Sequence, residues 1–212
     1  PEANPTAPDS PGHIVKARYT PQQQIVLAVD EQDSPHHALL READDLDGMP
    51  VVVTDLHSAL PAIIAGARSQ APDLTIAYVM PDGGALPAAF SRTVAGLRSA
   101  GWLAATITVG QAFGGDHEAV TVHTGLLAAR HVAGADLAIV IQGPGNVGTD
   151  TKWGFSGVSC AESLHAASVL GGMPCAALRV SGADARSRHR GISHHSLTAY
   201  GRALLAPATL PV

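Results

Sequence analysis

The sequence has few cysteines, few aromatic residues and almost no lysine. Two cysteines in 212 residues cannot hold a small fold together, which excludes a disulfide scaffold. Acidic residues (18) outnumber lysine and arginine (13), and no long basic stretch occurs, which argues against a nucleic-acid-binding protein. No apolar run approaches the roughly 20 residues that a membrane helix needs. We therefore expect a soluble, cytoplasmic protein without nucleic-acid or membrane partners.

Apolar residues and histidines are what the sequence has in quantity. The apolar fraction is 46%, enough buried surface to offset the cost of ordering the chain, so the composition excludes a disordered protein. There are 11 histidines, nearly as many as the 13 lysines and arginines together. Histidine is the side chain most often used near neutral pH as a metal ligand or acid/base. The positions of the histidines are therefore the first guide to a site.

The start of the chain differs from the rest. Prolines at positions 1, 5, 8 and 11 predict that residues 1–12 form a linker. The chain begins without methionine or a secretory signal, so we expect it to be part of a longer protein whose N-terminal domain is absent. Residues 13–212 have the length of a single α/β domain.

Strands and helices alternate along this domain. Two short strands, residues 13–20 and 24–31, predict a β-hairpin. The further predicted strands cover residues 50–54, 74–80, 103–109, 136–141 and 174–180, and the predicted helices cover 38–46, 60–69, 87–100, 119–132, 156–170 and 196–205. The alternation, with continuously apolar strands, predicts a three-layer α/β fold with a mostly parallel, Rossmann-like sheet and an N-terminal hairpin.

The loops that follow the predicted strands combine glycine with polar or acidic residues. Asp55 and His57 follow one strand, and Asp82 follows the next. Parallel sheets bind ligands outside the carboxyl ends of their strands. We therefore expect these residues to border one site.

A glycine-rich loop follows the strand at 136–141. Gly143 to Gly148 matches the G-x-G-x-x-G pattern of dinucleotide-binding loops. No helix is predicted to begin directly after it, and Pro144 lacks a backbone donor, so we argue against a nicotinamide or flavin cofactor. Exposed N–H groups in such a turn can instead hold phosphate or carboxylate. The residues expected to bind a ligand in or near this loop are Gly143, Gly145, Asn146, Gly148, Thr149 and Ser156.

Histidines and arginines gather before the last predicted helix. Ser193 has the chemistry of a helix N-cap, which places His194 and His195 in the first turn, where the helix dipole favours neutral imidazole. Three arginines, Arg186, Arg188 and Arg190, could clamp an anion. We expect acid/base catalysis from His123, His194, His195 and Asp55. A divalent metal ion bound by His57, His189 and His194 remains open as a cofactor.

Several of these segments carry a family resemblance. They are residues 15–19, 82–87, 122–126, 142–149, 153–157, 188–191 and 193–196. With them the chain, over residues 13–207, resembles an uncharacterised bacterial family, domain of unknown function 3866. The resemblance implies a lost N-terminal domain and brings no activity, cofactor or substrate.

The residues favour an enzyme, a hydrolase or transferase, that acts on a small anionic substrate. The glycine-rich loop and the arginines would hold the anion, and the histidines would perform the chemistry. One alternative is a non-catalytic module that binds or senses a small ligand through the same loops. Another is a structural homo-oligomer, and a homodimer remains open in every case.

Overall fold

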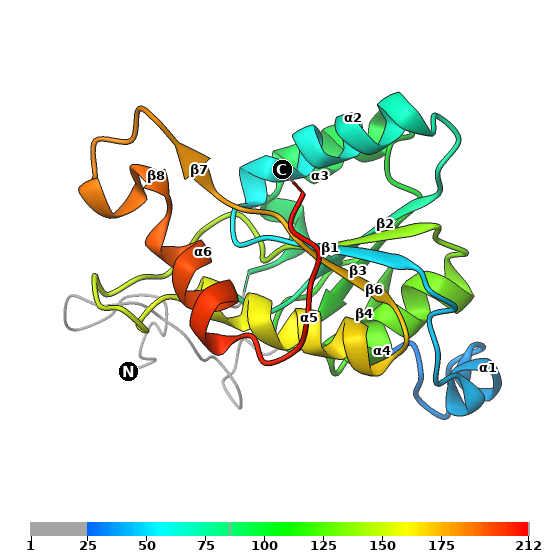
Figure 1. Ribbon diagram of the computed structural model, residues 1–212. Helices are drawn as coiled ribbons and strands as arrows, with labels where there is room; N and C mark the ends of the chain where they lie inside the picture. The colour runs from blue at the N-terminus through cyan, green and yellow to red at the C-terminus, as the bar shows by residue number, and fades with distance from the viewer. Residues whose placement is uncertain (1–24, 85, 212) are drawn as a thin grey trace, which may run out of the picture.

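The computed structural model describes residues 25–84 and 86–211. Six parallel strands form one sheet in the order β4-β3-β2-β5-β1-β6, and helices cover both of its faces (Figure 1). The predicted three-layer α/β fold is therefore confirmed. The strands are β1 (Pro50–Val53), β2 (Ile76–Met80), β3 (Ala105–Val109), β4 (His117–Ala119), β5 (Leu137–Val140) and β6 (Met173–Ala176).

The central strands carry mostly apolar side chains on both faces. β2, β3 and β5 are buried along their whole length, as expected for a sheet with covers on both sides. Successive residues of a strand point to opposite faces. In β2, Ile76 and Tyr78 therefore pack in one apolar cluster, whereas Ala77 and Val79 pack in the other.

Each face has its own pair of helices (Figure 1). α2 (Leu60–Gln70) and α3 (Arg92–Ser99) cover one face, and α4 (Val122–Leu127) and α5 (Cys160–Val169) cover the other. Two further short helices, α1 (His37–Glu42) and α6 (His194–Thr198), lie on the side of α4 and α5 (Figure 1). Among the described residues no helix is long and apolar enough to cross a membrane.

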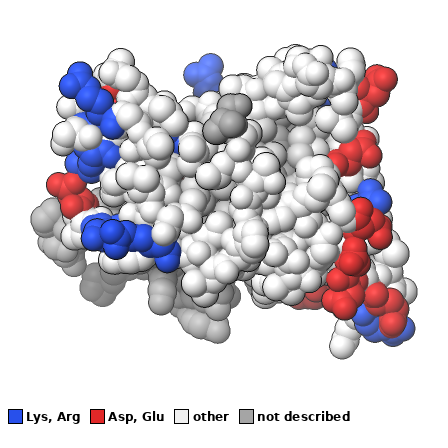
Figure 2. Space-filling view, in the orientation of Figure 1, with Lys and Arg blue, Asp and Glu red and all other residues white. Residues whose placement is uncertain are grey.

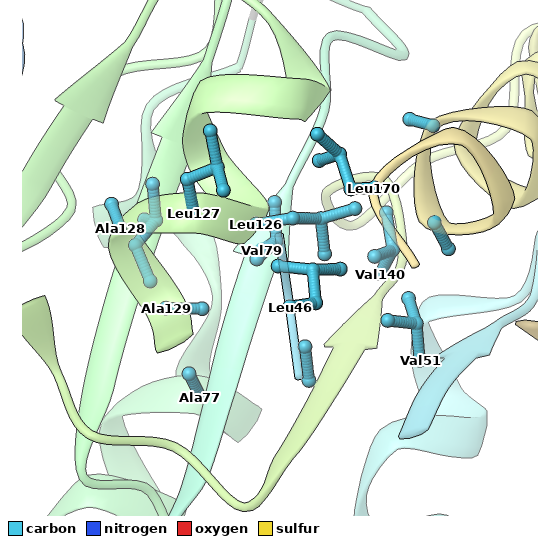
Figure 3. Packing of buried hydrophobic residues seen from close by; sticks show 14 of the residues in the cluster. Leu46, Val51, Ala77, Val79, Leu126, Leu127, Ala128, Ala129, Val140 and Leu170 are labelled. Carbon is cyan, nitrogen blue, oxygen red and sulfur yellow. The ribbon is translucent and has the colours of Figure 1, made fainter. Parts of the chain in front are cut away.

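The core on the α4 and α5 side is built from leucine and valine against alanine (Figure 3). Leu126 of α4 and Leu164 of α5 are fully buried. The alanines of the strands beneath them let the helices approach the sheet closely, since a methyl group occupies little space. This side of the molecule therefore fixes α5, whose preceding loop borders the site.

The order of the strands creates one crevice. β5 lies between β1 and β2, although it comes later in the chain. The chain passes outward from β2 to β3 and β4, and then returns to β5 and β6 on the other side. Reversals of this kind open a space at the carboxyl edge of the sheet. The loops after β1, β2 and β5 meet at this space.

The N-terminal hairpin lies mostly outside the described residues. Its first predicted strand, residues 13–20, is not described. Within the second, Ala28 forms a single parallel bridge to Glu118 of β4. This segment therefore touches the edge of the main sheet.

The last strand ends earlier than predicted. β6 stops at Ala176, because β1, its neighbour, stops at Val53 and offers only one further carbonyl, which accepts from the N–H of Ala177. The chain then leaves the sheet, and β7 (Val180–Ser181) pairs with β8 (Gly191–Ile192) in an antiparallel ribbon. This ribbon carries the arginine and histidine segment away from the sheet and over the crevice.

Candidate functional site

A cavity of about 200 Å³ lies between the glycine-rich loop after β5 and the β7–β8 segment. Its wall is mostly polar, and it collects charged and imidazole side chains from segments distant in the sequence. Among the residues that line it are His189, His194, His195, Arg179, Arg186, Arg188, Asn146, Gly148, Asp150 and Phe155. We call this the histidine–arginine cavity.

Three of the predicted histidines meet in this cavity. The ring centroids of His194 and His195 are 4.5 Å apart, and His189 lies 5.2 Å from His194 and 4.9 Å from His195. One nitrogen from each ring lies within 4.8 Å of the others. His189 and His195 are buried, and His194 is half-buried. The structure thus brings together two of the three predicted metal ligands and adds His195.

Asp55 fixes the ring of His195. Nδ1 of His195 lies 2.7 Å from Oδ2 of Asp55, which is 4% exposed. A carboxylate can only accept a hydrogen bond, so Nδ1 carries a proton and Nε2 is the nitrogen that has a lone pair when the ring is neutral. The ring of Phe155 stacks on that of His195 at 4.0 Å with an angle of 3° between the planes. The orientation of His195 is therefore set from an edge and from a face.

A second hydrogen bond fixes His189. Its Nδ1 lies 2.7 Å from Oγ of Ser193, which also caps α6 by accepting from the backbone N–H of His195. Burial, followed by the positive charge of Arg179, lowers the pKa of His189 to about 4, and burial also lowers the pKa of His194. These two imidazoles are therefore neutral near pH 7, the state in which a histidine can ligate a metal ion or accept a proton.

The glycine-rich loop supports Asp55 and does not form a dinucleotide cradle. The N–H of Thr149 donates to the carbonyl of Gly154, and the N–H of Ser156 donates to the carbonyl of Val147. The chain folds back on itself there, and α5 begins only at Cys160. The strand–turn–helix that a dinucleotide fingerprint requires is replaced by a closed turn, and two of the predicted anion-binding N–H groups are occupied within it.

Asn146 is the residue of this loop that contacts Asp55, the partner of His195. Its Nδ2 donates to Oδ2 of Asp55 at 3.2 Å, and its Oδ1 accepts from the hydroxyl of Ser156 at 2.9 Å. Asp55 is thus held by both Asn146 and His195. The segment that contains residue 157 also approaches Asp55 closely. This approach requires a glycine, since a Cβ at Gly157 would lie 2.6 Å from Cβ of Asp55.

Arginines supply the positive charge of the cavity. Figure 2 shows basic residues gathered at the end of the molecule where Figure 1 places β7 and β8, and acidic residues at the opposite end. Arg188 pairs with Asp150 at 2.6 Å, and Asp184 pairs with both Arg179 and Arg186. Arg186 holds the pKa of Asp184 well below its usual range. Only 14% of the Arg179 side chain is exposed.

His57 lies on the other side of the loop and does not join the three histidines. Its Nε2 is 2.7 Å from Oγ of Ser91, and its Nδ1 is 3.2 Å from the carbonyl of Gln142. Both ring nitrogens are therefore engaged, and burial lowers the pKa of the ring. Ser91 in turn caps α3, so His57 connects the loop after β1 to that helix.

The remaining predicted residues are distributed around the cavity or away from it. Gly143 and Gly145 line a separate cavity of about 320 Å³ beside His57, and a Cβ at Gly143 would collide with Met80. Asp82, Thr149 and Ser156 line a third, of about 280 Å³.

Two predicted residues lie outside these cavities. Arg190 is exposed and lines none of them. His123 is exposed at the start of α4, which follows β4 at the far edge of the sheet, with two strands between β4 and β5. The structure therefore does not bring His123 to the other histidines.

Three charged or aromatic residues of the cavity were not predicted. They are Arg179, Asp150 and Phe155. Arg186 lines the cavity together with Arg188, as its place in the run of arginines indicates. Asp150 adopts a left-handed backbone with φ of 62°, which is uncommon outside glycine and has no signature in a single sequence.

Comparison with known proteins adds a family and no activity. No curated protein and no solved structure matches this chain. The sequence model of one family matches residues 1–212, the whole sequence, and that family is described as a protein of unknown function, DUF3866. The chain therefore belongs to the DUF3866 family.

Proposed function

We propose that the protein is an enzyme that hydrolyses, or transfers a group from, a small anionic substrate bound in the histidine–arginine cavity. The observation that carries this proposal is the lining of one cavity by three imidazoles and three guanidiniums. Guanidinium groups bind carboxylate and phosphate bidentately. Neutral imidazoles accept protons or ligate metal ions near neutral pH. The cavity therefore combines anion binding with a chemically active group.

His195 has the best support for the chemical step. Asp55 accepts a hydrogen bond from its Nδ1, so Nε2 is the nitrogen that can take a proton when the ring is neutral. A carboxylate behind a histidine also stabilises the imidazolium that forms when the ring takes a proton from an attacking water or hydroxyl. Phe155 covers one face of the ring and limits the access of bulk water from that side. Charge that develops on the substrate would be stabilised by the arginines.

Binding of inorganic phosphate to an Arg188→Gln variant tests the anion site. Because a charge-assisted hydrogen bond contributes about 1.5–3 kcal/mol, we expect the Kd for phosphate measured by titration calorimetry to rise by roughly 10- to 100-fold. Arg190→Gln is the matched control, since Arg190 belongs to the same segment and does not line the cavity. Equal losses in both variants, or none in either, would contradict the proposal.

Turnover separates the enzyme from a binding module. Wild-type protein would be assayed against a panel of phosphomonoesters and small carboxylic esters, and the assay repeated with His195→Gln. We expect this variant to lose turnover while it still binds phosphate, because the arginines are untouched. A panel compound that binds and raises the melting temperature, with no compound in the panel turned over, would favour the sensing module instead.

A further inference from the structure

The three histidines of the cavity, His189, His194 and His195, bring one ring nitrogen each close to the other two. Within residues 25–84 and 86–211 they form the only group of three or more potential ligand side chains whose donor atoms all approach one another closely, here within 4.8 Å. We propose that His189, His194 and His195 bind one divalent transition-metal ion, best matched by zinc. An open coordination position would face the arginines. The inference rests on the proposed function for its catalytic role, and metal binding itself can be tested separately.

The Nδ1 atoms of His189 and His195 already have hydrogen-bond partners. Asp55 holds Nδ1 of His195, and Ser193 contacts Nδ1 of His189. Ligand histidines in metalloproteins nearly always donate their second ring N–H to a carboxylate, carbonyl or hydroxyl oxygen, which fixes the tautomer and orients the ring. In both rings Nε2 is then the nitrogen left for a metal ion. His57 lacks this property, because both of its nitrogens have partners.

The spacing of the ring nitrogens suits zinc. Zinc favours imidazole ligands in a tetrahedral arrangement, with Zn–N bonds of about 2.0–2.1 Å. Tetrahedral bond angles then place the nitrogens about 3.4 Å apart, so nitrogens within 4.8 Å of one another have to approach by about 1.4 Å at most.

The surrounding charge is balanced before a metal ion enters. The positive side chains are Arg179, Arg186 and Arg188, and the negative ones are Asp55, Asp150 and Asp184, so three charges of each sign cancel. A dication bound by neutral imidazoles would leave an excess of two positive charges. That excess matches a dianionic substrate such as a phosphomonoester. Three neutral ligands and an open position would also allow the ion to bind a water molecule and to lower the pKa of that water.

Zinc titration of chelator-treated protein tests the site. Wild-type protein would be dialysed against EDTA and then titrated with ZnCl₂ by calorimetry, with metal content measured by mass spectrometry. We expect one ion per chain, and at least a tenfold loss of affinity in His194→Gln, whose half-buried side chain is the least demanding of the three to replace. His117→Gln is the matched control, because His117 belongs to another histidine pair and should bind as wild type does.

A positioning role for Asp55 gives a second readout. Asp55→Asn keeps the shape of the side chain and removes the carboxylate, and supporting residues of this kind typically change metal affinity by about 10–100-fold. Substitution with Co²⁺ would show the visible absorption of a four-coordinate ion in the wild type and a changed spectrum in Asp55→Asn. Equal zinc affinity in wild type, His194→Gln and Asp55→Asn would overturn the inference.

The two proposals can fail separately. Phosphate binding that depends on Arg188, in protein that takes up no zinc, would remove the metal site and leave the anion site standing. Stoichiometric zinc with no phosphate binding and no turnover would do the reverse.

Discussion

Asp55 connects most of the polar groups of the site at the scale of single residues. Its carboxylate accepts from His195 and Asn146, and its backbone carbonyl accepts from Gln142 at 3.1 Å. A buried carboxylate is costly to leave unpaired, so these donors and the acid require one another. The Asp55 side chain also packs against Gly157 so closely that a Cβ at position 157 would collide with it.

The packing of Gly157 against Asp55 gives the first prediction. Gly157→Ala would force the Asp55 side chain away from His195, at a cost of about 1–3 kcal/mol in the free energy of unfolding, and it would weaken zinc binding. Gly66→Ala is the control, since nothing lies within 4 Å of its Cβ position in α2, and there alanine should stabilise by up to about 1 kcal/mol. Urea unfolding of the two variants measures both effects. Equal stabilities would contradict the prediction.

The depressed pKa of His189 predicts a pH dependence of stability. Folding lowers this pKa from 6.5 to about 4, so between these values the unfolded chain binds more protons than the folded one. The metal-free protein should therefore lose stability as the pH falls from 6.5 to 4. The loss should be smaller in His189→Gln, which retains Arg179, Arg186, His194 and His195 around the site. Parallel pH profiles of the two proteins in urea unfolding would refute the assignment.

At the scale of elements, the caps and turns were predictable, whereas the ends of several segments were not. Ser193 caps α6 as its position indicated. The predicted helix at 119–132 begins at Val122 and passes into a π-helical segment, Ala128–Val132. The glycine-rich loop was recognised as a turn. Its closure by the backbone of Gly154 was not foreseen, because nothing in the local pattern shows which N–H groups find internal partners.

The double role of Ser193 gives an element-scale prediction. Ser193→Ala removes the cap of α6 at a cost of about 0.5–2 kcal/mol, and it also removes the partner of His189. Thr121→Ala removes the corresponding cap of α4 at a similar cost. Both variants should therefore melt at lower temperature, and only Ser193→Ala should bind zinc more weakly. A matching loss of zinc affinity in Thr121→Ala would show that the effect is general destabilisation.

At the scale of the whole molecule, the topology decides which predicted residues meet. The sequence predicted the parallel sheet and the edge at which loops with polar residues gather. It could not show that β5 inserts between β1 and β2, because strand order depends on long-range packing. For this reason His123 was grouped with the other histidines, although it follows the edge strand β4. Asp55 and His57 are two residues apart but have different partners. Asp55 contacts Asn146 and His195, whereas His57 contacts Ser91.

The core and the site are separate parts of this topology, which predicts separable effects. Leu126→Ala in α4 would create a cavity in the fully buried core and cost about 2–5 kcal/mol. Because α4 does not contribute to the histidine–arginine cavity, zinc affinity of the folded variant should equal that of wild type. Thermal melting and zinc titration measure the two quantities. A joint loss of stability and zinc affinity would contradict the separation.

The central claim is that one cavity holds a metal ion beside an anion site, and anomalous diffraction tests it most directly. Crystals of the wild-type protein would be soaked in ZnCl₂ and inorganic phosphate, and data collected on both sides of the zinc absorption edge. The account predicts one anomalous peak within bonding distance of His189, His194 and His195, with a phosphate oxygen in contact with Arg188. An empty cavity under these conditions, or zinc bound only to other histidines, would contradict it.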